Sequence, residues 1–307
     1  MEKDFHYYIT YSIAKLTGYD NANIIGYSSQ FVDDNNEGQF VIDERESSFP
    51  EKIPAAGGYY YPIMTQSLSP KSLDPYVQKY VYNPFHFLPG DNNVEIKRKK
   101  NPLNTTPNSK NARTLLNEAL KSKNPYRIGI ALHTFSDTWS HQNFTGLRED
   151  WNSVYPWYNV FKSIVPNIGH AEVGHSPDVI SEDWIDYRID KKIINKVRAF
   201  EAVGEIYKVM REASGRGVDW TNIKVRYEEI IDTSGYDERI AKVANLLTDN
   251  GLGSIPDYSK DDWIGAALDK KDGKITMSAD FFNRDWYHFH QAAKVHFAAA
   301  MDVIKEL

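Results

Sequence analysis

Apolar residues recur at steps of three and four along most of the chain, the spacing that gathers them on one face of an α-helix. The first predicted helix runs from residue 4 to about 19, where Gly18 provides a stop. The same spacing predicts further helices at about 22–32, 111–121, 126–143, 151–164, 183–213, 227–231, 238–247 and 279–304. We therefore expect a helical core that the last of these helices closes.

The stretch 36–108 departs from this pattern. It is rich in Pro, Asn and aromatic residues and contains the run Tyr80-Val-Tyr-Asn-Pro-Phe-His-Phe87. We expect a long, aromatic, loop-like insertion with at most one hairpin, of the kind that commonly builds a binding site. The expected fold class is all-α: a single multi-helix domain over residues 1–307 with a loop insertion at about 36–108.

Composition narrows the classes of function. The chain has 307 residues, of which 41% are hydrophobic and 25% charged, and no Pro/Gly/Ser-rich linker divides it, so one sizeable core is expected. A net charge of -6 argues against binding along duplex nucleic acid, which requires Lys and Arg to neutralise many phosphates. There is no Cys, so a bound metal would depend on His, Asp and Glu.

The first residues, Met-Glu-Lys-Asp-Phe-His, carry charges where a signal peptide would place its apolar core. No stretch approaches the roughly 18 uninterrupted apolar residues of a membrane-spanning helix. A cytoplasmic protein without a transmembrane segment is expected, or a secreted one if a leader has been removed. The basic stretch Ile96-Lys-Arg-Lys-Lys100 is interpreted first as a solvated loop, and a functional version of it would attract anionic lipid heads in transient contact with a membrane surface.

The strongest candidate for chemistry is the triplet His133, Asp137 and His141. Steps of four residues place all three side chains on one narrow face of a helix. Imidazole and carboxylate are ligands that zinc and similar ions bind. A surface or capping role is the usual reading of a lone His, but three such residues in register favour a metal site, with Asp137 as the natural bridge between ions.

Further candidate ligands precede residue 179, and they are Asp4, His6, Asp33, Asp34, His86, His170, Glu172, His175 and Asp178. They exceed the needs of one tetrahedral ion and suffice for two or three ions around a shared carboxylate. The ordinary alternatives are a turn for the acidic pair and a half-buried structural role for the His between two Phe. The three His of the last predicted helix are interpreted as structural or surface residues: His288, His290 and His296.

The order of these residues resembles that of the zinc-dependent phospholipase C and single-strand nuclease superfamily. The matching elements, in chain order, are Asp4-x-His6, Asp33-Asp34, Pro84-Phe-His-Phe87, His133-x3-Asp137-x3-His141 and Gly169-His170. The spacing on the central helix is most similar to the glycosylphosphatidylinositol phospholipase D branch. The resemblance covers about residues 4–178, and it implies an all-α fold with three zinc ions in a cleft and phosphodiester hydrolysis by a metal-activated water.

By this resemblance, the first ion is surrounded by His86, His133, Asp137 and one of the two adjacent aspartates, with Asp34 preferred over Asp33. The family's corresponding aspartate lies near the attacking water and orients it or acts as base, a role that suits a carboxylate beside a cation. We therefore expect Asp34, with Asp33 as the alternative, to be the catalytic residue.

The resemblance also implies a second ion at His141 and His170. The family usually has a carboxylate four residues after the latter, where this chain has Gly174. The candidates for the missing ligand are then His175, which we prefer, Glu172 and Asp178.

A third ion is implied at His6 and the bridging Asp137. In secreted family members the amine and carbonyl of a processed N-terminal Trp also bind this ion. This chain has no such Trp, and Asp4 is expected to replace it.

The function predicted from these residues is that of a metal-dependent phosphoric-ester hydrolase, a phospholipase C-like phosphodiesterase that uses a zinc-activated water at two or three ions. Other divalent metals are alternatives to zinc, and the expected substrate is a phospholipid or another small phosphoester. The alternatives are a single-strand nuclease or other phosphodiesterase, and a metal-stabilised binding module without catalysis. The last draws support from Gly174 and from the missing Trp.

Overall fold

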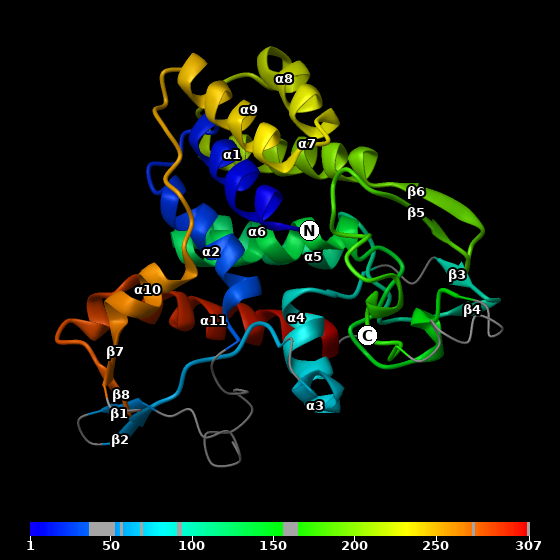
Figure 1. Ribbon diagram of the computed structural model, residues 1–307, viewed down its shortest axis with the longest axis horizontal. Helices are drawn as coiled ribbons and strands as arrows, with labels where there is room; N and C mark the ends of the chain where they lie inside the picture. Colours follow the sequence, from blue (N-terminus) through cyan, green and yellow to red (C-terminus); the bar gives the residue numbers. More distant parts are fainter. Residues whose placement is uncertain are drawn as a thin grey trace.

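The computed structural model describes residues 1–36, 53–55, 58–67, 70–90, 94–155, 165–271 and 274–305. Helix α6 (Pro125–Ser140) lies at the centre of the fold, and its residues from Ile128 onward are buried (Figure 1). The helix begins where the side chain of Asn124 accepts hydrogen bonds from the next backbone N–H groups, with Pro125 at the first helical position. Because α6 is buried on all sides, its polar residues face other parts of the protein and not solvent.

Four helices pack around α6: α2 (Ala22–Asp34), α5 (Lys110–Ser122), α7 (Asn195–Ser214) and α11 (Asp285–Lys305). The crossing with α2 is especially close at Gly129. A Cβ atom there would lie 2.4 Å from the carbonyl oxygen of Ile25 and 2.6 Å from Cβ of Ser28. Only glycine permits this approach, which brings the end of α2 beside the polar face of α6.

The N-terminal segment forms a π-helix, η1 (Asp4–Ile9), that continues into α1 (Thr10–Leu16). Helices α8 (Trp220–Asp232) and α9 (Tyr236–Asp249) cover the N-terminal segment and α7, as Figure 1 shows in yellow. Short 3₁₀ turns occur at η4 (Asp150–Asn152), η5 (Ala171–Val173) and η6 (Phe281–Asn283). The fold is mostly helical, as predicted.

In the described part of the chain, four two-stranded antiparallel sheets accompany the helices, so a purely helical description is too narrow. The pairs are β1 (Ile53–Ala55) with β2 (Gly58–Tyr60), β3 (Glu95–Ile96) with β4 (Lys99–Lys100), β5 (Asp183–Asp186) with β6 (Lys191–Ile194), and β7 (Leu268–Lys271) with β8 (Lys274–Met277). The helix α10 (Lys260–Ala267) and the β7–β8 hairpin have no counterpart among the predicted elements.

The expected loop at 36–108 is more ordered than predicted where the structure describes it. It contains two hairpins and a run of short helical turns: η2 (Pro70–Leu73), α3 (Pro75–Val77), η3 (Gln78–Tyr82) and α4 (Asn83–Phe85). Asp74 caps this run by accepting a hydrogen bond from the backbone N–H of Tyr76. Residues 37–52 and three shorter parts of the insertion lie outside the described residues.

Two helix predictions need correction. The run 183–213 begins as the β5–β6 hairpin and becomes helical only at Asn195. Its Ile residues are four apart, a spacing that also fits the two-residue period of a strand, and Trp184 points inward while Ile185 is 45% exposed. In 151–164 only the 3₁₀ turn η4 is found, and residues 156–164 lie outside the described part.

None of the described helices combines the length and the apolar character needed to cross a bilayer.

Candidate metal centre

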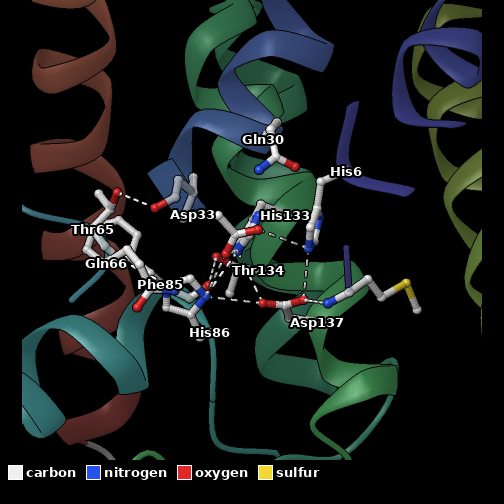
Figure 2. Close-up of polar contacts among 12 residues, drawn as sticks. His6, Gln30, Asp33, Thr65, Gln66, Phe85, His86, His133, Thr134 and Asp137 are labelled. Atoms are coloured by element: carbon white, nitrogen blue, oxygen red, sulfur yellow. Dashed lines mark hydrogen bonds and ion pairs between the residues drawn. The ribbon is translucent and has the colours of Figure 1, made fainter. Parts of the chain in front are cut away.

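Helix α6 presents His133 and Asp137 on one face (Figure 2). His141 follows at the C-terminal cap of the helix. One carboxylate oxygen of Asp137, Oδ2, lies 3.1 Å from Nε2 of His133 and 3.7 Å from Nδ1 of His141. All three side chains are buried. The four-residue spacing thus brings these residues together, and other segments complete three groups of potential ligands around them.

The first group consists of His6, His133 and Asp137. His6 is delivered by the π-helix η1, and its Nε2 lies 3.2 Å from the other carboxylate oxygen of Asp137, Oδ1. The two imidazole rings stack with centroids 4.0 Å apart. Among the residues that the structure describes, Nε2 of His6 has no hydrogen-bond partner, so its lone pair or proton faces the group.

The second group joins Asp33, at the end of α2, to His86 and His133. Nδ1 of His86 lies 3.1 Å from Nε2 of His133 and 3.8 Å from the carboxylate of Asp33, which is 3.7 Å from His133. Nε2 of His86 is 2.8 Å from the carbonyl oxygen of Thr65. Because a carbonyl only accepts, Nε2 carries the proton and the lone pair of Nδ1 faces the group.

The third group consists of His141, His170 and Asp178. Nε2 of His141 lies 3.1 Å from one carboxylate oxygen of Asp178, and Nε2 of His170 lies 3.2 Å from the other. The outer nitrogen of each ring, the one that points away from the group, is again fixed by a backbone carbonyl. Nδ1 of His141 donates to the carbonyl of His86 at 2.8 Å, and Nδ1 of His170 donates to the carbonyl of Gly174 at 2.8 Å.

These arrangements fit divalent metal ions. In metal sites a ligating His usually donates its outer N–H to a carbonyl or carboxylate, which fixes the ring and its tautomer. His86, His141 and His170 all follow this rule. Two ligand atoms bound at about 2.0–2.1 Å to a tetrahedral zinc lie roughly 3.3 Å apart. The contacts within the groups, 3.1 to 3.8 Å, fall around that separation. The donors, nitrogen and carboxylate oxygen, are those that zinc accepts.

Metal binding requires neutral imidazole and ionised carboxylate, and the pKa shifts of His6, His133 and Asp137 favour these states. The shifts of two other residues oppose them: burial would lower the pKa of His86, but the hydrogen bond to Asp137 and the charge of Asp33 raise it, and burial raises the pKa of Asp33. Burial lowers the pKa of both His6 and His133 to about 4. Burial alone would raise the pKa of Asp137, but the amino group of Met1, 2.6 Å from Oδ1, and the neighbouring His141 hold it well below its usual range. Near pH 7 the carboxylate is charged and these two rings are neutral.

Asp137 is placed as the sequence suggested for a bridging residue. Its Oδ1 faces His6, and its Oδ2 faces His86 and His133. Asp137 therefore contacts His6 of the first group through one oxygen and His86 of the second through the other, while His133 belongs to both groups. Within the third group, the two oxygens of Asp178 contact His141 and His170 separately.

Asp4 lies away from the three groups, contrary to expectation. Its buried carboxylate forms an ion pair with Arg239 from α9, and its Oδ1 accepts a hydrogen bond from the backbone N–H of Phe5. Arg239 also donates to the carbonyl of Thr233. Asp4 therefore anchors the helix that carries His6, and the expected replacement of the N-terminal Trp by Asp4 does not fit this geometry.

The structure also reverses the preference within the acidic pair. Asp34 lines the pocket that most of the potential ligands line, but its Oδ2 accepts hydrogen bonds from Tyr258 at 2.7 Å and from Gln30 at 3.1 Å. Its neighbour Asp33 approaches the histidines instead (Figure 2). Adjacent residues on a helix point about 100° apart, so only one of the two can face the groups.

Of the three candidates for the partner of His170, Asp178 occupies the place. His175, the preferred one, is exposed, and Glu172 accepts hydrogen bonds from the backbone N–H groups of Val154 and Tyr155. Gly174 contributes its carbonyl, with a φ of +61° that disfavours other residues. The carboxylate that the resemblance places at position 174 is therefore supplied from position 178.

A pocket of about 720 Å³ is lined by six of the eight potential ligands, while His6 and His133 are fully buried and do not line it. Apart from the potential ligands, its lining is largely apolar or aromatic, and includes Leu73, Tyr82, Phe87, Ile168 and Tyr236.

Sequence reasoning missed Thr65, whose carbonyl orients His86, because a backbone acceptor leaves no signal in residue types. It also missed Tyr258, which comes from a segment more than 200 residues away from Asp34.

A family model described as a family of unknown function, DUF6765, matches residues 1–304, a range that contains every residue of the three groups. No curated protein and no solved structure matches the chain.

Proposed function

The chain belongs to the DUF6765 family, and we propose that it is a metal-dependent phosphoric-ester hydrolase acting on a phospholipid or another small phosphodiester. One observation carries the proposal. Among the described residues, three groups of His and carboxylate side chains adjoin one another, six of these eight residues line one pocket, and three of the imidazoles are oriented by backbone carbonyls. Clusters of neighbouring ions held in this way commonly serve phosphoester hydrolysis.

We assign the potential ligands from these groups and place His133, which belongs to two of them, with Asp33 and His86. His6 and Asp137 would hold one ion, Asp33, His86 and His133 a second, with Asp137 shared between the two. His141, His170 and Asp178 would hold a third. Zinc or a similar ion, when bound, supplies an activated water near neutral pH and neutralises charge that develops on the phosphoryl group.

Asp33 is the residue that we propose to orient the attacking water and to accept its proton. Its side chain is 26% exposed, in contrast to the 1% of Asp137, so it lies where solvent reaches the groups. In the proposed reaction water attacks phosphorus, the bond from phosphorus to the leaving oxygen breaks, the water proton passes to the carboxylate, and the leaving oxygen takes a proton from solvent and departs as the alcohol. No Ser or Cys nucleophile is needed.

The lining of the pocket supports a small or lipid substrate over a polynucleotide. Besides the proposed ligands, Glu2 and Asp34 line it, and these two carboxylates would repel a long phosphate backbone. The apolar residues of the lining suit a substrate with a hydrocarbon part. The order of the ligands along a mostly helical chain supports placement in the zinc-dependent phospholipase C and single-strand nuclease superfamily.

The test is hydrolysis of phosphatidylcholine and, separately, of single-stranded DNA by the purified protein, each with and without a chelator. We expect phosphatidylcholine to be cleaved, the chelator to abolish cleavage, and added zinc to restore it. Cleavage of DNA alone would identify a nuclease. Bound metal without turnover of either substrate would favour the binding module.

A further inference from the structure

A second pocket, of about 710 Å³, adjoins the metal pocket. The two share Pro166 in their linings. Basic side chains line the second pocket where histidines and carboxylates line the first: Lys97, Lys99, Arg148 and Arg188. The charge therefore changes sign across Pro166.

Most of this positive charge comes from the β3–β4 hairpin. Lys97 and Arg98 form its turn, with φ of 52° and 60°, and Lys99 and Lys100 follow in β4. All four side chains are exposed, although Nζ of Lys97 also donates to the carbonyl of Ser153 at 2.9 Å. The tight turn presents four cations in succession at the surface.

Few nearby carboxylates neutralise this charge. Within the part of the chain that the structure describes, Arg98, Lys99, Lys100 and Arg148 form no ion pair within 4.0 Å. Glu172 is held by backbone N–H groups, and the guanidinium of Arg188 binds Asp186. Asp150 is the remaining carboxylate of the lining, and the exposed Glu95 stands opposite Lys100 in the hairpin itself.

Burial and the nearby guanidinium of Arg188 lower the pKa of Lys97 from its usual range. The carboxylates of Asp150, Glu172 and Asp186 act on this pKa in the opposite direction. In a chain with a net charge of -6, such a concentration of cations is a local feature.

Exposed apolar side chains border the two pockets. Leu73, 47% exposed, lines the metal pocket, and Val165, 38% exposed, lines the basic pocket next to Pro166. Surfaces that combine cations with exposed apolar side chains bind at the interface of anionic bilayers. A polynucleotide would profit from the cations but not from the apolar side chains, and it would meet the carboxylates of the metal pocket.

We infer that the β3–β4 hairpin, Arg148, Leu73 and Val165 bind the surface of an anionic bilayer and hold the opening of the metal pocket at the lipid–water interface. The binding itself is independent of catalysis. The delivery of a lipid substrate to the pocket rests on the proposed function.

Vesicle sedimentation tests this inference with the full chain. We expect binding to vesicles that contain phosphatidylserine, weaker binding at higher salt, and little binding to vesicles of phosphatidylcholine alone. Arg98→Glu with Lys99→Glu should weaken binding by about tenfold or more, since each basic residue near such a surface contributes substantially. The matched control is Lys110→Glu with Lys121→Glu, the same charge change at exposed positions of α5, which should retain binding.

Two results would overturn the inference. One is the absence of a specific effect of the hairpin: the hairpin variant binds vesicles as well as the wild-type protein does, or the control variant loses vesicle binding to the same extent. The other is hairpin-dependent binding of single-stranded RNA without binding to the vesicles. Circular dichroism and metal content of both variants establish that they are folded. Because vesicle binding is measured without turnover, it can succeed even if the protein hydrolyses no phosphoester.

Discussion

The carboxylate of Asp178 lies 3.2 Å from Nε2 of His170, although eight positions separate the two residues along the chain. The 3₁₀ turn η5 and the glycine that follows it fold the intervening segment back, so that the carbonyl of Gly174 fixes the outer nitrogen of His170. The group of His141, His170 and Asp178 is therefore complete without a carboxylate at position 174.

Asp178→Asn should lower the metal content of the purified protein by about one equivalent, because an amide is a poorer ligand than a carboxylate. Elemental analysis after dialysis measures this. His175→Gln is the matched control, since His175 is exposed in the same segment. An unchanged metal content in the Asp178 variant, or an equal loss in the control, would remove this group from the account.

Asp33→Asn should reduce phosphoester turnover by about 100-fold or more, the range expected when a positioned carboxylate base is lost. The helical circular dichroism signal should stay unchanged. Asp34→Asn, one residue later, should have a much smaller effect, since Asp34 is engaged by Tyr258 and Gln30. The pair of initial rates tests the assignment, and it is contradicted if the Asp34 variant is the more impaired.

The sequence was sufficient to identify most of the residues that meet in the pocket. The i, i+4 spacing of His133, Asp137 and His141 follows from helix geometry alone, and the structure brings all three together. The choice between Asp33 and Asp34 depends on the rotation of α2 relative to α6. That rotation is set by tertiary packing at Gly129, which local periodicity does not contain.

The incorrect predictions of secondary structure, and of Asp4 as a ligand, have similar causes. Ile185, Ile189 and Ile193 are spaced by four, which fits a helix and a strand equally, and the turn with Asp190 at a φ of +49° decides for the hairpin. Within 36–108, helical segments as short as α3 and α4 contain too few residues for a period to be visible. Asp4 was a plausible ligand by position, but Arg239, far along the chain, binds it.

Gly129→Ala should destabilise the protein by about 1–3 kcal/mol, the usual cost of overpacking, because the new methyl group would collide with the backbone of α2. It should also weaken metal binding, since α2 carries Asp33. The control is Gly204→Ala in α7, where the nearest atom would be 3.6 Å away, and helix propensity should give about 0.5–1 kcal/mol of stabilisation. Urea denaturation midpoints compare the two. Equal effects would contradict the close α2–α6 crossing.

His290 should make the stability depend on pH. Burial, with a smaller effect of Lys294, lowers the pKa of this residue from 6.5 to about 3. Between these values the unfolded chain binds a proton that the folded chain does not, so stability falls as the pH falls, by up to about 1.4 kcal/mol per pH unit. His290→Gln should flatten this dependence below pH 6.5 and leave the dependence above it unchanged. Denaturation in the presence of a chelator measures it, and parallel curves for the two proteins would refute the prediction.

The most direct test of the whole account is the metal content of the purified protein and of its Asp137→Asn variant, measured by elemental analysis. Asp137 contacts ligands of more than one group through its two oxygens. We expect two or three equivalents of a divalent metal, with zinc favoured, in the wild-type protein and a loss of more than one equivalent in the variant. A wild-type protein that retains no divalent metal, or a variant that retains all of it, would contradict the central claim.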